Sequence, residues 1–420
     1  MIDDDAIDFL LRFLDVPSVS PLEGGDPAQT RRAQDLFGAF AASRGFTVSQ
    51  EVADPAGVLA DPRTPVLVRE KAALDGWLSD QPVVAASIGD PDAPRTLVIN
   101  AHVDTVSPHL AVTLRDGVIR ARGAVDDKGP QVAALCGVAR AYRDDPGLAR
   151  RVRTTLLSVP GEEGGAMGCY GTKPALERRG KASLLVFAEP TGLLVHDTSF
   201  ATMTLEVTMD APDSTDDFPY ENANATLVLG AVATGLASGL KDRVEGRDVR
   251  CCIAGLHTGT QHNRVYGSGR LLVNIAYCDA GAAAAVRESA EEILTATVER
   301  VKEEYGTSRF GRLWARDLGR VLHWRWLKQG LPSLRNRSET YEALLAECGF
   351  DRLAGDQLGE AFTSDAIWGQ GAADYTVICG PGGLDSHGAH TDGEYVTVDE
   401  LNEYARRIAL LVRRLADTAA

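Results

Sequence analysis

The sequence predicts an α/β protein with a mixed, largely parallel sheet and a smaller α+β domain inserted in the middle of the chain. The first observation is the length of 420 residues, which exceeds what one ordinary hydrophobic core holds together. The second is that continuous apolar segments and amphipathic segments alternate in the first half. The third is a change of pattern near Asp197, after which the earlier pattern resumes at Leu331.

Four apolar segments of strand length predict the main sheet, at residues 96–100, 154–159, 183–188 and 376–379. A helical segment over 130–142 separates the first two strands. Uninterrupted apolar strands that alternate with helices are typical of a parallel sheet covered on both faces. Further amphipathic helices are predicted near the two ends of the chain, over 4–15, 29–43 and 398–416.

The middle of the chain has the pattern of a split βαβ, ferredoxin-like domain. Its strands are predicted at 200–209, around 251–252, at 271–277 and at 320–327. Its helices are predicted at 222–239, between the first two strands, and at 282–305, between the last two. We therefore expect a main domain of residues 1–197 and 329–420. Residues 198–328 are expected to form the inserted domain.

Composition excludes several classes of protein. The chain has 43 basic and 59 acidic residues and a net charge of −16, which disfavours a nucleic-acid partner because phosphate binding needs a basic surface. The N-terminal residues lack the basic and apolar regions of a signal peptide, and no uncharged apolar run is long enough to span a membrane. Seven cysteines without a CxxC pair indicate reduced thiols and a cytoplasmic protein.

Imidazoles and carboxylates follow the ends of the predicted strands, where ligands bind in open α/β sheets. Histidine nitrogen and carboxylate oxygen are ligands suited to zinc and related divalent ions. The candidate metal ligands are His102, Asp126, Glu163, Glu189 and His390. Five such ligands, with an aspartate bridging, are enough to hold two ions roughly 3.5–4 Å apart.

Two further carboxylates lie beside these candidates. Asp104 is two residues from His102 on extended chain and is expected to turn toward the imidazole and orient it. Glu162 precedes Glu163 on a predicted tight turn and is the candidate general base. Each element alone has an ordinary explanation, because a pair of glutamates is usually solvated surface and Asp126 could belong to a simple turn. The conjunction of all of them at strand ends favours a metal site.

The sequence blocks AHVDT, GAVDDKG, EEGG, AEP and AHTDGEYV resemble the signature blocks of the M20 metallopeptidases. That family includes acetylornithine deacetylase, succinyl-diaminopimelate desuccinylase and glutamate carboxypeptidases. The resemblance implies a zinc-peptidase-like catalytic domain with a lid, and two divalent ions, zinc with cobalt or manganese as alternatives. It implies Asp126 as bridging ligand, Asp104 as orienting residue and Glu162 as general base. His390 is preferred to His387 as the last ligand because it stands four residues before Glu394.

The predicted lid departs from the family pattern. The segment 210–220 lacks the histidine that family lids usually carry, and Tyr266 and Ala276 stand where a proline and an arginine are common. Asn263 matches a substrate-binding position of the family. The residues considered as replacements for the missing groups, or otherwise as ordinary lid surface, are His257, His262, Arg264 and Arg270.

These features together predict hydrolysis of an amide bond by a metal-bridging water that Glu162 activates. The expected substrate is a small-molecule amide with a free carboxylate, either an N-acyl amino acid or a dipeptide-like compound. No nucleic acid or membrane partner is expected, and a homodimer would form through the lid. Two alternatives remain: a family member adapted to a biosynthetic pathway, acting on a carrier-linked amide or performing acyl transfer, and a metal-binding protein without turnover.

Overall fold

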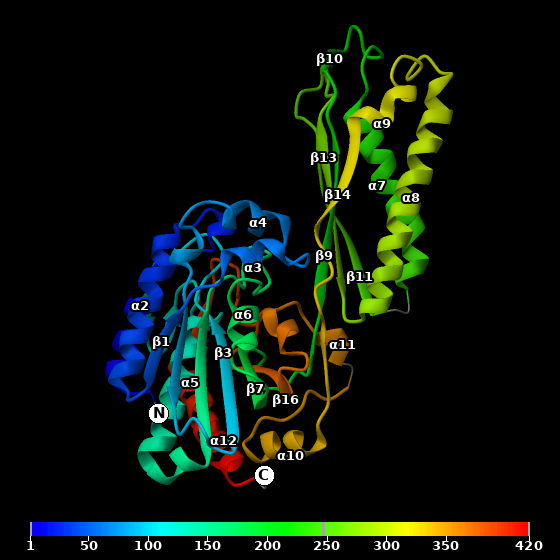
Figure 1. Ribbon diagram of the computed structural model, residues 1–420. Helices are drawn as coiled ribbons and strands as arrows, with labels where there is room; N and C mark the ends of the chain where they lie inside the picture. Colours follow the sequence, from blue (N-terminus) through cyan, green and yellow to red (C-terminus); the bar gives the residue numbers. More distant parts are fainter. Residues whose placement is uncertain (1, 246–247, 356, 419–420) are drawn as a thin grey trace. The chain divides into compact units, whose positions relative to one another are not determined.

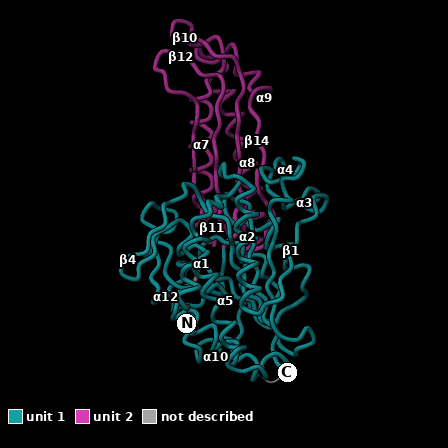
Figure 2. Tube along the Cα trace, turned by 90° about the vertical axis from the view of Figure 1, so that its left-hand side faces the viewer, with its two compact units in different colours: residues 1–199, 334–420 teal, residues 200–333 magenta. Residues whose placement is uncertain are grey.

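The computed structural model describes residues 2–245, 248–355 and 357–418. The chain divides into two compact units, drawn in different colours in Figure 2. Unit 1 consists of Met1–Ser199 and Leu334–Ala420, and unit 2 of Phe200–Ser333. The chain therefore leaves unit 1, forms unit 2 and returns.

The core of unit 1 is a six-stranded mixed sheet (Figure 1). In spatial order its strands are β1 (Thr47–Glu51), β2 (Val83–Ile88), β6 (Val152–Val159), β3 (Arg95–His102), β7 (Ala182–Pro190) and β16 (Ala373–Gly380). Strands β6, β3, β7 and β16 are parallel neighbours, and β2 and β1 are added antiparallel at one edge. The sheet is therefore largely parallel, as the apolar segments predict.

Helices cover one face of this sheet and form its larger hydrophobic core with side chains such as Leu97 and Ile99. These helices are α1 (Asp4–Leu14), α2 (Pro27–Ser43), α5 (Lys128–Asp144) and α12 (Val398–Ala416). A smaller core lies on the opposite face, where Ala175 and Ala366 pack against strand residues such as Val98. They belong to the short helices α6 (Thr172–Glu177) and η5 (Asp365–Gly369).

Shorter elements complete unit 1. The helices are η1 (Pro21–Glu23), α3 (Pro55–Ala60), α4 (Val66–Ala72), η2 (Leu78–Asp80), η3 (Pro146–Arg150), α10 (Glu339–Glu347) and α11 (Gln357–Glu360). The strands form a three-stranded sheet and a two-stranded pair: β17 (Tyr395–Thr397), β5 (Val118–Arg120) and β4 (Thr113–Arg115), and β15 (Leu334–Arg335) with β8 (Thr198–Ser199).

Unit 2 is a split βαβ domain. Its antiparallel sheet has the order β11 (Val249–His257), β13 (Gly269–Tyr277), β9 (Ala201–Met209) and β14 (Leu322–Lys328). Two long helices, α7 (Ala225–Val244) and α8 (Ala280–Gly306), lie side by side along the sheet (Figure 1). The remaining elements are β10 (Ser214–Thr215), β12 (Arg264–Val265), η4 (Ala315–Asp317) and α9 (Leu318–Val321). The order of strands and helices along the chain is the one predicted from sequence.

The unit boundaries differ from the expected divisions after residues 197 and 328. The chain passes from unit 1 to unit 2 directly after β8 and returns directly before β15. Strands β8 and β15 pair with each other, so both belong to unit 1. On the other side of the second crossing, the hydroxyl of Tyr277 donates to the carbonyl of Leu331 over 2.8 Å. The hydroxyl of Ser333 donates to the carbonyl of Cys278, also over 2.8 Å. These bonds hold 331–333 to unit 2.

Among the residues that the model describes, no helix is long and apolar enough to cross a membrane.

Candidate metal centre

Three parallel strands deliver three of the five predicted ligands to one edge of the main sheet. Strand β3 ends at His102, and β7 carries Glu189 as its penultimate residue. Strand β6 ends at Val159, and the turn that follows carries Glu162 and Glu163. Because carboxyl ends of parallel strands meet at the same edge, residues far apart in sequence converge there.

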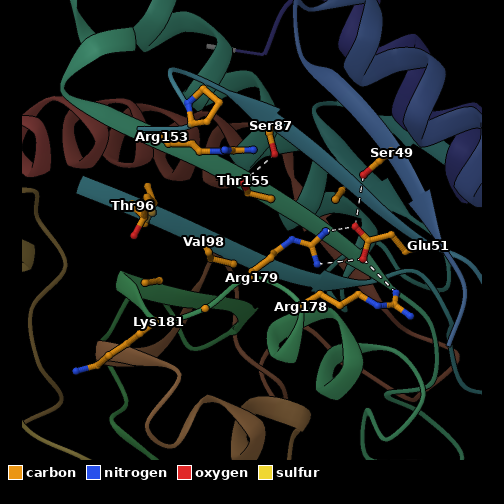
Figure 3. Close-up of a pocket in the computed structure, with 15 residues that line it drawn as sticks. Ser49, Glu51, Ser87, Thr96, Val98, Arg153, Thr155, Arg178, Arg179 and Lys181 are labelled. Carbon is orange, nitrogen blue, oxygen red and sulfur yellow. Dashed lines mark hydrogen bonds and ion pairs between the residues drawn. The ribbon is translucent and has the colours of Figure 1, made fainter. Parts of the chain in front are cut away.

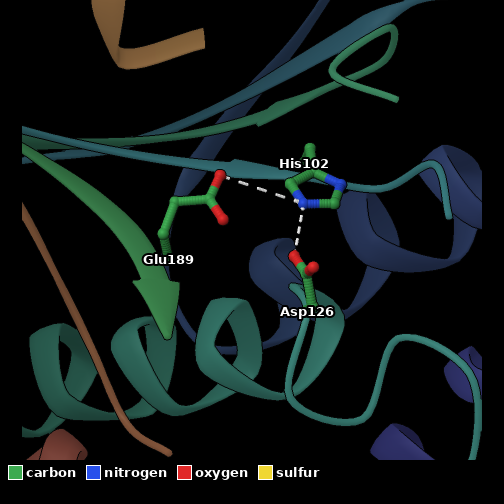
Figure 4. A group of neighbouring side chains, drawn as sticks. All are labelled: His102, Asp126 and Glu189. Atoms are coloured by element: carbon green, nitrogen blue, oxygen red, sulfur yellow. Dashed lines mark hydrogen bonds and ion pairs between the residues drawn. The ribbon is translucent and has the colours of Figure 1, made fainter. Parts of the chain in front are cut away.

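The first group of ligand atoms comes from His102, Asp126 and Glu189, all buried (Figure 4). The imidazole Nε2 of His102 lies 2.8 Å from Oδ1 of Asp126 and 3.9 Å from Oε1 of Glu189. Figure 4 shows the three side chains pointing toward one another from a strand end, a helix-leading loop and a neighbouring strand. This arrangement can hold one divalent ion.

The second group consists of Asp126, Glu163 and His390. Nε2 of His390 lies 3.1 Å from Oδ2 of Asp126 and 3.1 Å from Oε1 of Glu163. His390 has φ of 64°, a left-handed conformation that is uncommon for a residue with a side chain. Asp126 belongs to both groups and presents a different oxygen to each imidazole, which is the arrangement that a bridging ligand requires.

The chemistry of the donor set fits divalent cations. Within each group all ligand atoms lie within 4.8 Å of one another. The carboxylate of Glu189 is buried, and its ionic contact to the His102 imidazole is long at 3.9 Å, so a bound cation would compensate its charge. Hydrogen bonds with Asp126 and Glu163 raise the pKa of His390 to about 11. Burial, followed by the charge of Asp126, raises the pKa of Glu189 well above its ordinary value. The cluster therefore attracts positive charge strongly.

Asp104 contacts His102 differently from the expectation. The imidazole Nδ1 donates to the backbone carbonyl of Asp104 over 2.7 Å, whereas the Asp104 carboxylate lies 3.9 Å away. That carboxylate instead accepts from the backbone N–H groups of Glu162 and Glu163, at 3.3 and 3.1 Å. The carbonyl fixes the tautomer that leaves Nε2 of His102 free to be a ligand. The carboxylate fixes the turn that carries the glutamates.

Glu162 lies beside the cluster, in a group with His102 and Glu163 whose ligand atoms are again within 4.8 Å of one another. It is less buried than Glu163. Low-polarity surroundings and the adjacent Glu163 carboxylate raise the pKa of Glu162 well above its ordinary value. A carboxylate whose proton affinity is raised in this way is suited to take up a proton.

His387, the rival of His390, is engaged elsewhere. Its Nδ1 accepts from the backbone N–H of Gly383 over 3.0 Å, and its Nε2 lies 2.8 Å from Oε1 of Glu400. His387 is absent from all three groups of candidate metal ligands among the described residues. The structure brings His390, and not His387, to the cluster.

Two buried features near the cluster were not recognised in the sequence. The guanidinium of Arg122 donates to Glu394 over 2.6 Å, and Glu394 also accepts from the backbone N–H of Val125 over 3.2 Å. This pair ties the loop before Asp126 to the segment after His390. The second feature is the buried carboxylate of Asp365 on η5.

Asp365 accepts hydrogen bonds from the hydroxyl of Thr172 and, over 3.4 Å, from the amide of Asn100. Its burial raises its pKa to about 6. Asn100 is the one signal that was available in the sequence, because a polar residue within an apolar strand requires a buried partner.

The predicted lid residues belong to unit 2. Asn263 is exposed in the segment between β11 and β12, together with His262. Arg264 pairs with Asp213 and lies over the Tyr266 ring. Arg270 is exposed and lies 4.0 Å from the carboxylate of Glu206, and His257 is its neighbour across β11 and β13.

The fold and this cluster define a class of α/β proteins that gather imidazole and carboxylate ligands at the carboxyl edge of a sheet and carry an inserted α+β domain. The chain belongs to peptidase family M20/M25/M40, whose model matches residues 98–414.

Three relatives illustrate the range of similarity. A protein of Aeropyrum pernix named "Putative [LysW]-lysine/[LysW]-ornithine hydrolase" is 29% identical over 220 residues, which are 52% of this chain and 58% of that protein. The M20 family metallo-carboxypeptidase Sso-CP2 from Sulfolobus solfataricus has a similar structure, with a TM-score of 0.70, 15% identity and coverage of 99% and 100% of the two chains. The Bacillus subtilis YXEP protein, described as a dinuclear metal binding peptidase, gives a TM-score of 0.61, 13% identity and coverage of 97% and 96%. The match to the Aeropyrum pernix protein spans little more than half of that protein's length.

Proposed function

We propose that this protein is a hydrolase of amide bonds that depends on two divalent metal ions. One observation carries the proposal: two groups of three ligands share Asp126 and no other residue. A single ion would need only one such group, whereas a shared aspartate suits a pair of ions. The description of the structurally similar Bacillus subtilis protein as dinuclear supports the same reading.

In this proposal His102 and Glu189 hold one ion, Glu163 and His390 hold the other, and Asp126 bridges them. Zinc suits the mixed nitrogen and oxygen donors, with cobalt or manganese as alternatives. When bound, such ions polarise a carbonyl oxygen and make a water more acidic. The rest of the chemistry falls to the side chains of this chain.

Glu162 is proposed as the general base. It belongs to the described ligand groups yet is left over once the five ligands are assigned, and it stands on the turn that Asp104 holds through two backbone hydrogen bonds. Its carboxylate would take the proton of the attacking water and pass it to the nitrogen that leaves as an amine. A protein that only binds metal has no need of this base, so a role without turnover is the weaker proposal.

The substrate proposed is a small amide with a free carboxylate, either an N-acyl amino acid or a dipeptide-like compound. Positive charge in unit 2 would have to recognise that carboxylate, and Arg264 and Arg270 are the proposed candidates. Asn263 is proposed to contact the substrate. Arg270 is the better placed of the two arginines, because Arg264 already pairs with Asp213.

A second candidate substrate is favoured by one comparison. The relative from Aeropyrum pernix is named for hydrolysis of [LysW]-lysine and [LysW]-ornithine, in which the amino acid is written as a conjugate. An amide that links lysine or ornithine to a larger carrier is therefore a specific alternative to a free acyl amino acid. It would also account for a lid that lacks the usual histidine, because a larger conjugate needs other contacts.

The test is a substrate panel with the zinc- or cobalt-loaded protein, in which release of free amine is measured. The panel contains N-acyl amino acids, dipeptides, and peptides to which lysine or ornithine is joined by an amide bond. Turnover of any of them that is lost in Glu162→Gln supports the proposal. Absence of turnover across the panel, with two ions bound, would favour the role without catalysis.

The proposed assembly is a homodimer formed through unit 2. The sheet of unit 2 has two edge strands, β11 and β14, and β11 exposes Ile253 and Leu256. An exposed edge strand with apolar side chains is a surface that proteins usually cover. Analytical ultracentrifugation of wild type and Leu256→Lys tests it, with a shift toward monomer expected in the variant. A monomeric wild type would contradict it.

A further inference from the structure

A basic cavity lies in unit 1 on the sheet face opposite the four long helices. Its volume is about 390 Å³. It is lined by Ser49, Glu51, Ala85, Ser87, Pro91, Thr96, Leu97, Val98, Arg153, Thr155, Arg178, Arg179, Gly180, Lys181 and Ala182. Four of these side chains are basic and one is acidic, although the chain as a whole carries a net charge of −16. A basic cavity in an acidic protein calls for a specific explanation.

Arg153 supplies a positive charge in the cavity that no described acidic side chain compensates. It stands on β6, is only partly exposed, and makes no ion pair or hydrogen bond through its side chain to any described residue. In Figure 3 the side chains of Arg153 and Arg179 reach over the strands with Thr155 between them. A guanidinium presents a planar fork of donors that matches a carboxylate or a phosphate.

The opposite side of the cavity also has an excess of positive charge. Arg178 and Arg179 share a single carboxylate, that of Glu51, with contacts at 3.2 and 3.3 Å to the same oxygen (Figure 3). Two cations that share one anion leave one positive charge uncompensated. Lys181 contributes less, because it pairs with Asp374 at 2.7 Å and is 60% exposed.

The floor of the cavity provides a neutral donor. The hydroxyls of Ser87 and Thr155 lie 2.8 Å apart and share one hydrogen bond. Two hydroxyls carry two protons and their mutual bond uses one, so the other remains to be donated to a ligand. No described acceptor takes it. The cavity thus offers the Arg153 guanidinium, a surplus cation beside Glu51 and a hydroxyl donor.

The cavity is separate from the metal centre. It touches the first residues of β3, β6 and β7, at Thr96, Arg153 and Ala182, whereas the ligands follow the other ends of the same strands. Thr96 and His102 are six positions apart along β3, which corresponds to about 20 Å of extended chain. A molecule in the cavity would therefore contact the strands that carry the metal ligands without competing with the substrate.

We propose that this cavity is a second ligand site, which binds a small anion with two negative charges between Arg153 and the Arg178–Arg179 pair. Phosphate and a short dicarboxylate share the required chemistry. Both offer oxygens on two sides, one for the fork of Arg153 and one for the surplus charge beside Glu51. A monocarboxylate meets only one of these requirements.

The experiment is titration calorimetry of the metal-loaded protein at constant ionic strength set with chloride. Phosphate, succinate and acetate are added to wild type, Arg153→Gln and Arg150→Gln. Arg150 is an exposed arginine outside the cavity, so its replacement removes the same charge without touching the site. We expect saturable binding of at least one dianion, about tenfold weaker in Arg153→Gln and unchanged in Arg150→Gln.

A second variant tests the floor of the cavity. Thr155→Val keeps the shape but removes the hydroxyl, and a several-fold weaker dianion affinity is expected. If Arg153→Gln binds both dianions as wild type does, they bind elsewhere, the metal centre included, and the proposal is wrong. Equal losses in Arg153→Gln and Arg150→Gln, or acetate bound as tightly as the dianions, would also overturn it. The better of the two dianions identifies the ligand as phosphate-like or carboxylate-like.

Discussion

His102 and His390 contact opposite oxygens of one carboxylate: Nε2 of His102 lies 2.8 Å from Oδ1 of Asp126, and Nε2 of His390 lies 3.1 Å from Oδ2. The first imidazole ends a central strand, and the second stands in a loop after the last strand of the sheet. Asp126 therefore joins two ligand groups that arrive from different parts of the chain. The predictions about metal content depend on this relationship.

Metal analysis of the protein purified without chelator should approach two equivalents of divalent ion per chain. Asp126→Asn keeps the size of the side chain but removes its negative charge and replaces one ligand oxygen by an amide NH2, and we expect less than one equivalent. His102→Ala should lose metal as well as activity.

His387→Asn is the matched control, because His387 pairs with Glu400 and is not in the cluster. It should retain both ions, and a wild type that stays at one equivalent under added zinc would contradict a bridging Asp126.

Replacement of the two adjacent glutamates should have different effects. Glu162→Gln preserves the shape of the side chain but cannot accept a proton, so turnover should fall roughly 10²–10⁴-fold with metal content nearly unchanged. Glu163→Gln should lose metal, because Glu163 belongs to the second ligand group. Parallel metal analysis and single-turnover kinetics separate the two effects. If Glu162→Gln releases metal and Glu163→Gln does not, the two roles are reversed.

Much of the fold could be predicted because its signals are local. The buried strands β3, β6, β7 and β16 are continuous apolar runs, and α12 is amphipathic over its whole length. The edge strand β1 was missed because its residues are mostly polar and exposed, so neither apolar continuity nor alternation marks it. Its neighbour β2 is apolar but short, and it follows a segment of short helices.

The clustering of the proposed ligands could also be expected from the sequence, because each lies directly after an apolar strand or within a recognisable block. Their contacts could not. The bond from His102 to the Asp104 backbone carbonyl depends on the chain turning after β3, and spacing alone suggested the carboxylate. The left-handed conformation of His390 and the pairing of Arg122 with Glu394 arise from tertiary packing, which no local pattern encodes.

The pH dependence of stability should contain a contribution from His196. Burial lowers the pKa of this imidazole, with the charges of Asp197 and Glu360 acting in the opposite direction. In the unfolded chain the pKa is about 6.5. Below that pH the unfolded state binds a proton that the folded state resists, so stability is lost as pH falls from about 6.5 toward the lower folded pKa, and is unaffected above it.

The measurement is thermal unfolding of wild type and His196→Leu between pH 5 and pH 8. The variant has no titrating ring, so its Tm should fall less than that of wild type on acidification below about 6.5. The difference between the two proteins isolates His196 from the titration of the metal ligands, which both share. Parallel curves for the two proteins over this range would show that the pKa of His196 is the same in the folded and unfolded states, and the prediction would be wrong.

The last prediction concerns recognition of the substrate by unit 2. The segment 210–220 has no cationic side chain, whereas Arg264 and Arg270 both follow Asn263 in the chain. Arg264 is held by Asp213, and Arg270 lies 4.0 Å from Glu206, whose stronger partner is Arg325 at 2.8 Å. Of these two arginines, Arg270 is therefore the one whose charge is less compensated, and the one we expect to contact a substrate carboxylate.

Once a substrate is found, Arg270→Ala should raise KM or lower kcat by more than tenfold, because loss of a charge-assisted contact costs about 1.5–3 kcal/mol. Arg264→Ala should have a smaller effect, which reflects its pairing with Asp213.

Asn263→Ala should lower kcat if its amide supports the developing oxyanion, an effect that can reach about 10²–10³-fold. Arg320→Ala, a change at an exposed arginine that pairs with Asp317 at 3.4 Å, is the control for loss of charge in unit 2. If neither Arg264→Ala nor Arg270→Ala changes turnover or KM beyond about threefold, both arginines are surface residues. The carboxylate must then be recognised from unit 1, or the substrate lacks one.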